Sequence, residues 1–197
     1  MSNLRQKWFE ILDRVYKETQ GLNSGVDCMS KCDGRCCPRR STTRFQHTGF
    51  IIFLPYELEY IASIKNQSVM ELEDSWSIHK TDLELPGDEI LSVCWTRSCP
   101  FLNRGLCGIH DTRPFDCVSF PILSFVIENQ VKFSIAEKCP LSLTVSKDFQ
   151  DTIQEVWIRL YLELPVSWWN LVEQLVISNS SLTFEHLPGV KYLGIDF

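Results

Sequence analysis

The residues best suited to chemistry in this 197-residue chain are its nine cysteines, most of which are clustered. Thiolates are soft, anionic ligands that suit zinc, iron and iron–sulfur clusters. The first cluster reads C-M-S-K-C-D-G-R-C-C, in which Gly34 lets the backbone wrap around an ion. The clustered cysteines, which we expect to bind metal, are Cys28, Cys32, Cys36, Cys37, Cys99, Cys107, Cys117 and Cys139. Cys94 stands apart from them, and we expect it to be a small core residue.

The spacing of these cysteines favours an iron–sulfur cluster over zinc but leaves both open. Structural zinc sites are closed tetrahedra, and the clustered thiolates are numerous enough to close more than one. A [4Fe–4S] cluster needs only four cysteines, some of them distant in sequence. The neighbouring side chains of Cys36 and Cys37 diverge, so they suit a polynuclear site, or one ligand plus one free thiol. The strongest ligand candidates are Cys28, Cys32, Cys36, Cys99, Cys107 and Cys117.

The order of the motifs resembles the YkgJ family of cysteine-cluster proteins, whose domain is described as zinc- or iron-chelating. The resemblance covers about residues 25 to 142. The segment F-L-P-Y-E-L-E-Y-I-A is similar to the short helix after the first cluster of that family. This chain departs from the pattern at His110, where tyrosine is common, and at Val118, where arginine often follows the cysteine. The matching residues are Cys28, Cys32, Cys36, Cys37, Cys99, Pro100, Phe101, Leu102, Cys107, Ile109, Arg113, Pro114, Cys117, Phe120 and Pro121.

Two polar residues of the second cluster are candidates to contact the metal or its ligand. His110 lies three positions after Cys107 and could be a ligand or a proton donor. Arg113 could donate hydrogen bonds to cluster sulfurs or to a substrate carboxylate, or it could form an ion pair with Asp111 or Asp116. We assign His110 and Arg113 as cofactor-binding residues. No residues combine into a recognisable catalytic arrangement, so the catalytic residues stay unknown.

Composition and charge narrow the class of protein. A formal charge of −6 argues against nucleic-acid binding. No stretch reaches the roughly 18 apolar residues that span a bilayer, and the N-terminus lacks the apolar region of a secretory signal. We therefore expect a cytoplasmic protein that binds neither nucleic acid nor membrane. In a reducing compartment the cysteines favour metal binding over disulfides.

Hydrophobic periodicity predicts helices, strands and irregular segments. We expect helices over 4–19, 55–64, 147–161 and 168–177, strands over 48–54 and 92–95, a hairpin over 124–135, and irregular segments over 66–90 and from 182 onward.

These elements predict an α+β fold, in which a small β-sheet and cysteine-rich loops are organised around a metal site and flanked by N- and C-terminal helices. We expect residues 1–197 to form a single domain. Within it, 1–22 is an N-terminal helix, 25–142 the metal-binding core and 147–197 a C-terminal helical extension.

The sequence thus predicts an iron–sulfur ([4Fe–4S]) protein that serves electron transfer or Lewis-acid catalysis on a small molecule or peptide. One alternative is a zinc-stapled, non-catalytic module that binds a protein partner through its aromatic C-terminal helices. Another is a metal chaperone or sensor, supported by the Cys36–Cys37 pair. Whether the chain is an enzyme is left undecided. We expect the aromatic residues of the C-terminal helices to be core or an oligomer contact, with a ligand platform as the alternative; they are Trp157, Tyr161, Trp168 and Trp169.

Overall fold

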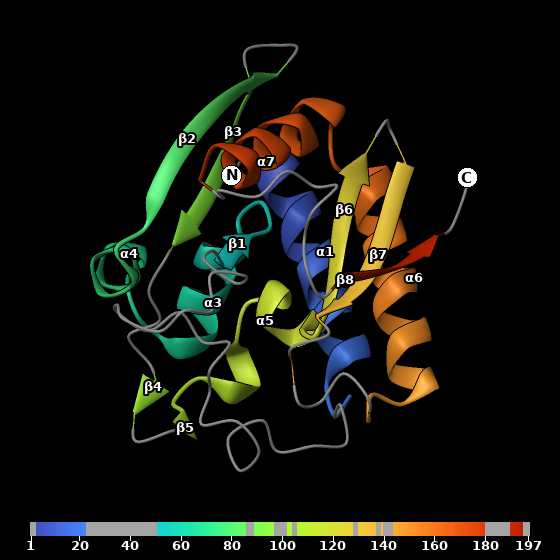
Figure 1. Cartoon of the computed structure of the whole chain (residues 1–197). Coiled ribbons are helices and arrows are strands. Elements are labelled where there is room, and N and C mark those ends of the chain that lie inside the picture. Colours follow the sequence, from blue (N-terminus) through green and yellow to red (C-terminus); the bar gives the residue numbers. More distant parts are fainter. Residues whose placement is uncertain are drawn as a thin grey trace. The chain divides into compact units, whose positions relative to one another are not determined.

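The computed structural model combines helices with small antiparallel sheets (Figure 1), which confirms the α+β class. The chain divides into two compact units, and each is described by itself. The first unit comprises Met1–Gln20 and Cys37–Val118, and the second comprises Gly21–Cys36 and Ser119–Phe197. The structure describes residues 3–22, 51–85, 89–96, 102–103, 106–127, 130–136, 139, 144–179 and 190–194.

The first unit contains a three-stranded sheet in the order β1-β3-β2, in which both neighbouring pairs are antiparallel. A second, two-stranded ladder joins β4 to β5. The elements of this unit are α1 (Asn3–Thr19), β1 (Ile51–Phe53), α3 (Glu57–Lys65), α4 (Val69–Trp76), β2 (His79–Leu85), β3 (Glu89–Thr96), β4 (Leu102–Asn103), β5 (Leu106–Cys107), the 3₁₀ turn η2 (His110–Thr112) and α5 (Phe115–Ser119).

Helix α1 confirms the helix predicted over 4–19. Its buried stripe contains Trp8, Leu12 and Val15, at the spacing that places them on one face. The helix ends before Gly21, whose φ of 80° is the left-handed conformation that glycine adopts without steric cost.

Helices α1 and α3 contact each other through polar and aromatic groups. Arg5 Nε donates to Glu59 Oε2 at 2.7 Å, and its guanidinium lies 4.2 Å from the centroid of the Phe9 ring. The Phe9 and Tyr60 rings meet edge to face, with their centroids 5.7 Å apart. These contacts fix α1 beside the short helix that follows β1.

A hydrophobic cluster, which we call the first-unit core, joins β1 to α3 and α4. Its two largest members, Phe53 and Trp76, meet edge to face with ring centroids 5.3 Å apart. Both side chains are 1% exposed, so replacing either Phe53 or Trp76 by alanine would leave a cavity in the core. The members of the first-unit core are Ile51, Phe53, Leu58, Ile61, Ala62, Leu72, Trp76 and Ile109.

The prediction of an irregular segment over 66–90 is wrong, because these residues contain α4, all of β2 and the start of β3. Helix α4 begins with a capping box, in which Glu71 N–H donates to Ser68 Oγ and Ser68 N–H donates to Glu71 Oε2. Strand β2 pairs with β3 from His79–Trp95 to Leu85–Glu89. Its charged side chains alternate with half-buried ones, as on an edge strand that faces water. The many charged residues of this acidic segment obscured the apolar periodicity that would have indicated helix α4 and strand β2.

The second unit contains a three-stranded antiparallel sheet in the order β6-β7-β8, packed with two helices. The predicted hairpin is confirmed, since β6 and β7 pair from Ile122–Ile135 to Ile127–Gln130. The irregular tail expected from 182 is wrong in part, because β8 pairs with β7. The elements of this unit are β6 (Ile122–Ile127), β7 (Gln130–Ala136), α6 (Lys147–Glu163), α7 (Val166–Asn179) and β8 (Val190–Gly194).

Helices α6 and α7 confirm the two C-terminal helices predicted on either side of Pro165. Both helices contact β6. The indoles of Trp157, Trp168 and Trp169 are buried, and Trp168 meets Trp169 edge to face at 5.0 Å. These three indoles are therefore core residues, as one of the interpretations predicted.

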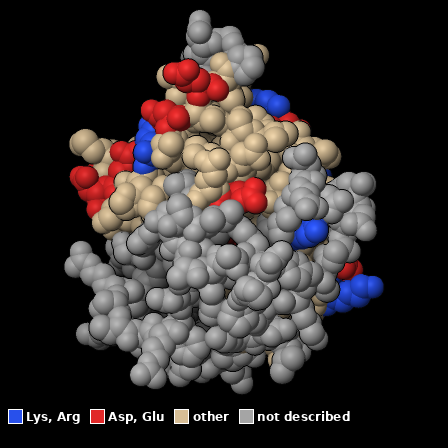
Figure 2. Space-filling model, turned by 45° about the horizontal axis from the view of Figure 1, so that its top comes forward, with Lys and Arg blue, Asp and Glu red and all other residues tan. Residues whose placement is uncertain are grey.

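On the face shown in Figure 2, acidic side chains are spread over the surface of the described residues, in keeping with the formal charge of −6. In the part of the chain that the structure describes, no helix has both the length and the apolar character needed to cross a membrane.

The capping box of α4 gives a stability prediction. Ser68→Ala removes the side-chain acceptor for Glu71 N–H, so we expect a loss of about 1 kcal/mol, which lowers the melting temperature by about 2–4 °C in a chain of this size. Ser75→Ala, at an exposed interior position of the same helix, serves as the control and should leave the melting temperature unchanged or slightly raised. Equal melting temperatures for the two variants would contradict the cap assignment.

Candidate metal centre

Three of the eight predicted cysteine ligands lie among the described residues. Cys107 and Cys117 belong to the first unit, and Cys139 belongs to the second. The other five predictions, Cys28, Cys32, Cys36, Cys37 and Cys99, lie outside the described residues.

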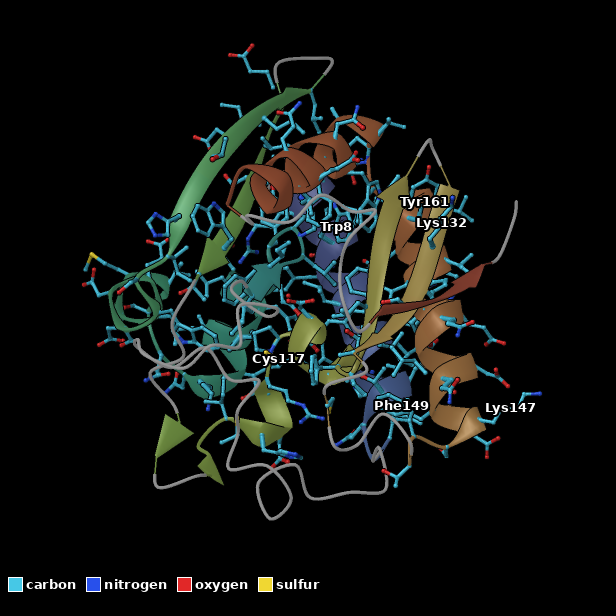
Figure 3. The ribbon with its side chains drawn as sticks, viewed as in Figure 1. Trp8, Cys117, Lys132, Lys147, Phe149 and Tyr161 are labelled. Atoms are coloured by element: carbon cyan, nitrogen blue, oxygen red, sulfur yellow. The ribbon has the colours of Figure 1, made fainter. Side chains whose placement is uncertain are left out.

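Cys107 and Cys117 pack against the same hydrophobic cluster although they are separated in sequence. Cys107 ends β5, and Cys117 lies on α5, where Figure 3 labels it. Both are half-buried, and both contact the first-unit core. Among the described residues, no three histidine, cysteine or acidic side chains gather as a metal-holding group. The described part therefore supplies two ligand candidates on one core, and a complete ligand set needs further residues.

Helix α5, which carries Cys117, is a single turn fixed by its first residues. Pro114 precedes it, and the Pro114 carbonyl accepts from Cys117 N–H at 2.8 Å and from Val118 N–H at 3.0 Å. The Phe115 side chain is 1% exposed and anchors the turn. The backbone of Cys117 is thus held by hydrogen bonds and burial.

A buried carboxylate, that of Glu57, joins three separate segments of the first unit. Its Oε2 accepts from Leu54 N–H at 2.9 Å, at the turn between β1 and α3. Its Oε1 accepts from Phe115 N–H, the first of α5, at 2.7 Å, and from the Tyr16 hydroxyl of α1 at 2.9 Å. The residue is 0% exposed, so these bonds replace water as its solvation.

The next residue of α5 is held in a similar way. Asp116 Oδ2 accepts from Ile52 N–H, in the middle of β1, at 3.2 Å. Consecutive residues of α5, Phe115 and Asp116, are therefore fixed to the β1–α3 segment immediately before Cys117. Two adjacent attachment points restrict both the position and the rotation of this turn.

The Tyr16 hydroxyl lies between two acceptors. It is 2.9 Å from Glu57 Oε1 and 3.0 Å from the Arg113 carbonyl oxygen. A phenol carries one proton, so it donates fully to only one of them at a time. When Glu57 is ionised, the Tyr16 hydroxyl donates its proton to the carboxylate. With Glu57 protonated, the carboxyl can donate to the phenol oxygen while the phenol donates to Arg113.

Burial raises the pKa of both carboxyls. It raises the pKa of Glu57 to about 7, with the charge of Asp116 adding to the rise, although the bonds from Phe115, Leu54 and Tyr16 lower it. Burial raises the pKa of Asp116 to about 6, and the bond from Ile52 N–H opposes this.

The phenol of Tyr16 responds to the same surroundings. Burial and the neighbouring Glu57 raise its pKa well above the usual value, and negative charge on Cys117 adds to the rise. This influence of Cys117 places the Tyr16 hydroxyl within electrostatic range of a predicted metal ligand.

His110 and Arg113, the predicted cofactor-binding residues, contact each other. Arg113 Nη1 lies 3.2 Å from His110 Nε2, and His110 is exposed in η2. Since a guanidinium only donates, Nε2 is the acceptor and Nδ1 carries the imidazole proton. Among the described residues Arg113 forms no ion pair with Asp111 or Asp116, so that alternative is wrong there. In this geometry His110 Nε2 could bind a metal only after Arg113 moves.

The two remaining described cysteines occupy different surroundings. Cys94, on β3, is half-buried against the first-unit core, and burial raises its pKa to about 11. It therefore stays a thiol, as expected of a small core residue. Cys139 is buried in the second unit, and its N–H donates to the Ala136 carbonyl at 2.8 Å.

Sequence reasoning did not identify Tyr16 and Glu57 as site residues, and it considered Asp116 as an ion-pair partner of Arg113. Their partners include backbone N–H groups, which leave no trace in side-chain spacing. Comparison with family models, with curated proteins and with solved structures gives no match to this chain.

The raised pKa of Glu57 predicts how stability depends on pH. The folded state holds the proton up to about pH 7, whereas an unfolded glutamate loses it near its ordinary pKa of 4.5. This contribution to stability is therefore complete below pH 4.5 and is lost as the pH rises through about 7. A pKa unit corresponds to about 1.4 kcal/mol, so we expect Glu57→Gln to flatten the fall in unfolding free energy between pH 5 and pH 8.

Urea unfolding at pH 5 and pH 8 measures this effect. Asp74→Asn, which removes an exposed carboxylate from α4, serves as the control and should keep the wild-type slope. If the Glu57→Gln curve runs parallel to the wild-type curve, the carboxyl does not titrate as described.

Proposed function

We propose that this chain is a cysteine-ligated metal-binding protein, and that its metal is most consistent with an iron–sulfur cluster of the [4Fe–4S] type. The observation that supports this proposal best is the clustering of eight cysteines, two of which, Cys107 and Cys117, pack on one core. The resemblance to the YkgJ family, carried by the motifs of residues 25 to 142, supports the same class of site.

The surroundings of Cys117 suit a ligand. Its sulfur belongs to a half-buried residue on a backbone fixed through Phe115 and Asp116. Fixed ligand positions lower the ordering cost of binding. A cysteine binds a metal as its thiolate, so metal binding at Cys117 should release the thiol proton.

An iron–sulfur cluster would supply one-electron transfer, or Lewis-acid activation of a small molecule or peptide if one iron kept an open position. The proposed ligands are Cys28, Cys32, Cys36, Cys37, Cys99, Cys107, Cys117 and Cys139. Arg113 and His110 are the proposed polar contacts beside them. A cytoplasmic location without nucleic-acid partners belongs to the same proposal.

A zinc-stapled module that binds another protein is the second candidate, because thiolates paired on short loops also suit zinc. Its binding surface was expected on the aromatic C-terminal helices. The Trp168 and Trp169 indoles are buried, whereas Leu162 and Val166 at the junction of α6 and α7 are 75% and 55% exposed. Among the described side chains of these helices, these two are large exposed apolar groups that such a surface would offer. A metal chaperone or sensor is a further alternative, and it depends on the Cys36–Cys37 pair.

Metal analysis of protein purified without oxygen tests the proposal. We expect iron and sulfide, with broad absorption near roughly 400 nm that dithionite bleaches. Cys117→Ser should lose most of the metal, because it removes a proposed ligand. Cys94→Ala changes a cysteine on the same core without removing a proposed ligand, so it should keep the metal.

A colourless, redox-silent protein with bound zinc would favour the protein-binding module instead. Full metal content in Cys117→Ser would remove this residue from the ligand set.

A further inference from the structure

We propose that Tyr16 and Glu57 are positioning residues for the Cys117 ligand, so that metal affinity depends on how helix α1 is docked. This inference rests on the proposed function, since it concerns the same metal site. It adds that helix α1, which carries no cysteine, influences that site through hydrogen bonds.

The first step of this connection is the hydrogen bond between Glu57 and the start of α5. Phe115 N–H belongs to the first residue of that helix and lies two positions before Cys117. The first N–H groups of a helix depend on acceptors outside the helix. Glu57 Oε1 accepts from it at 2.7 Å in a site without solvent exposure. If the carboxylate moves, this buried N–H loses its partner, so the start of α5 follows Glu57.

The carboxylate is itself held from two sides. Leu54 N–H fixes Oε2 from the β1–α3 turn, and the Tyr16 hydroxyl fixes Oε1 from α1. The Tyr16 hydroxyl also lies 3.0 Å from the Arg113 carbonyl, in the segment that leads from Cys107 to Cys117. One hydroxyl of α1 therefore contacts both the group that anchors α5 and the backbone just before it.

The rest of α1 keeps that hydroxyl in place. The Tyr16 ring packs on the Tyr60 ring, with centroids 5.2 Å apart, and contacts the first-unit core. Arg5 of α1 pairs with Glu59 of α3 at the other end of the contact. A displacement of α1 would consequently withdraw the Tyr16 hydroxyl from Glu57 and Arg113 together.

Groups that orient metal ligands from outside the coordination sphere commonly contribute about 10–100-fold to metal affinity. Tyr16→Phe removes one oxygen atom and preserves the ring that packs on Tyr60. We expect this variant to bind Zn²⁺ about 10-fold more weakly, at the lower end of that range, because its hydroxyl acts on the backbone of α5 and not on a sulfur. Zn²⁺ is the probe because thiolates bind it whichever metal is native.

Tyr60→Phe is the matched control. Its hydroxyl lies 3.5 Å from Asp13 Oδ1 and also links α3 to α1, and among the described residues no hydrogen bond joins it to Glu57 or α5. The experiment measures Zn²⁺ affinity by competition with a chromogenic chelator for the metal-free wild type and both variants. Melting temperatures of the metal-free proteins are measured in parallel. Weaker binding in Tyr16→Phe, with wild-type affinity in Tyr60→Phe, supports the positioning role.

Glu57→Gln provides a second variant. Its single carbonyl oxygen can serve Phe115 and Tyr16, but its amide group then faces Leu54 N–H, so two donors oppose each other. We expect a loss of Zn²⁺ affinity at least as large as in Tyr16→Phe.

The outcomes separate this inference from the proposed function. If the wild type binds Zn²⁺ and Cys117→Ser weakens that binding, but Tyr16→Phe and Glu57→Gln both bind like the wild type, the positioning role is wrong and the metal site stands. A wild-type chain that neither contains metal as purified nor binds Zn²⁺ would overturn both.

Discussion

The first unit depends on one electrostatic constraint, the need to solvate the buried carboxylate of Glu57. A carboxylate without water is stable only when protein donors replace its hydration. Its donors come from α1, from the β1–α3 turn and from the start of α5. Two of these donors, Tyr16 and Phe115, are 99 positions apart in the sequence. Removing any one donor leaves a buried charge less well compensated. The arrangement of these three segments is therefore coupled to a single side chain.

This constraint bears on the proposed metal site because α5 carries Cys117. A five-residue helix has little stability of its own, so its geometry comes from Pro114, from the burial of Phe115 and from the bonds to Glu57 and Asp116. A ligand placed on such a turn is ordered before metal binds. The residue is half-buried, and the backbone that carries it is held by these hydrogen bonds.

The sequence predicted the elements whose signal is local. Apolar periodicity was enough for α1, α6 and α7, and alternation was enough for the β6–β7 hairpin. These local patterns were not enough for β2, whose charged residues suit an edge strand, or for β8, which is recognised by its pairing with β7. The cysteine pattern predicted Cys107 and Cys117 as ligands, and the structure adds their common core. Glu57 could not be found in this way, because its partners are two backbone amides and a tyrosine 41 positions away.

The position of the Tyr16 hydroxyl explains how the buried site can tolerate a change of charge. A metal bound by Cys117 would change the charge near Glu57 and Tyr16, because a free thiol is neutral and a ligating thiolate is anionic. A carboxyl with a pKa of about 7 can gain or lose a proton in response. In the ionised state the phenol donates to Glu57, and in the protonated state Glu57 donates to the phenol while the phenol donates to the Arg113 carbonyl, so the Tyr16–Glu57 hydrogen bond is kept in both states. The same contacts can therefore hold α5 in place whether Glu57 is charged or neutral.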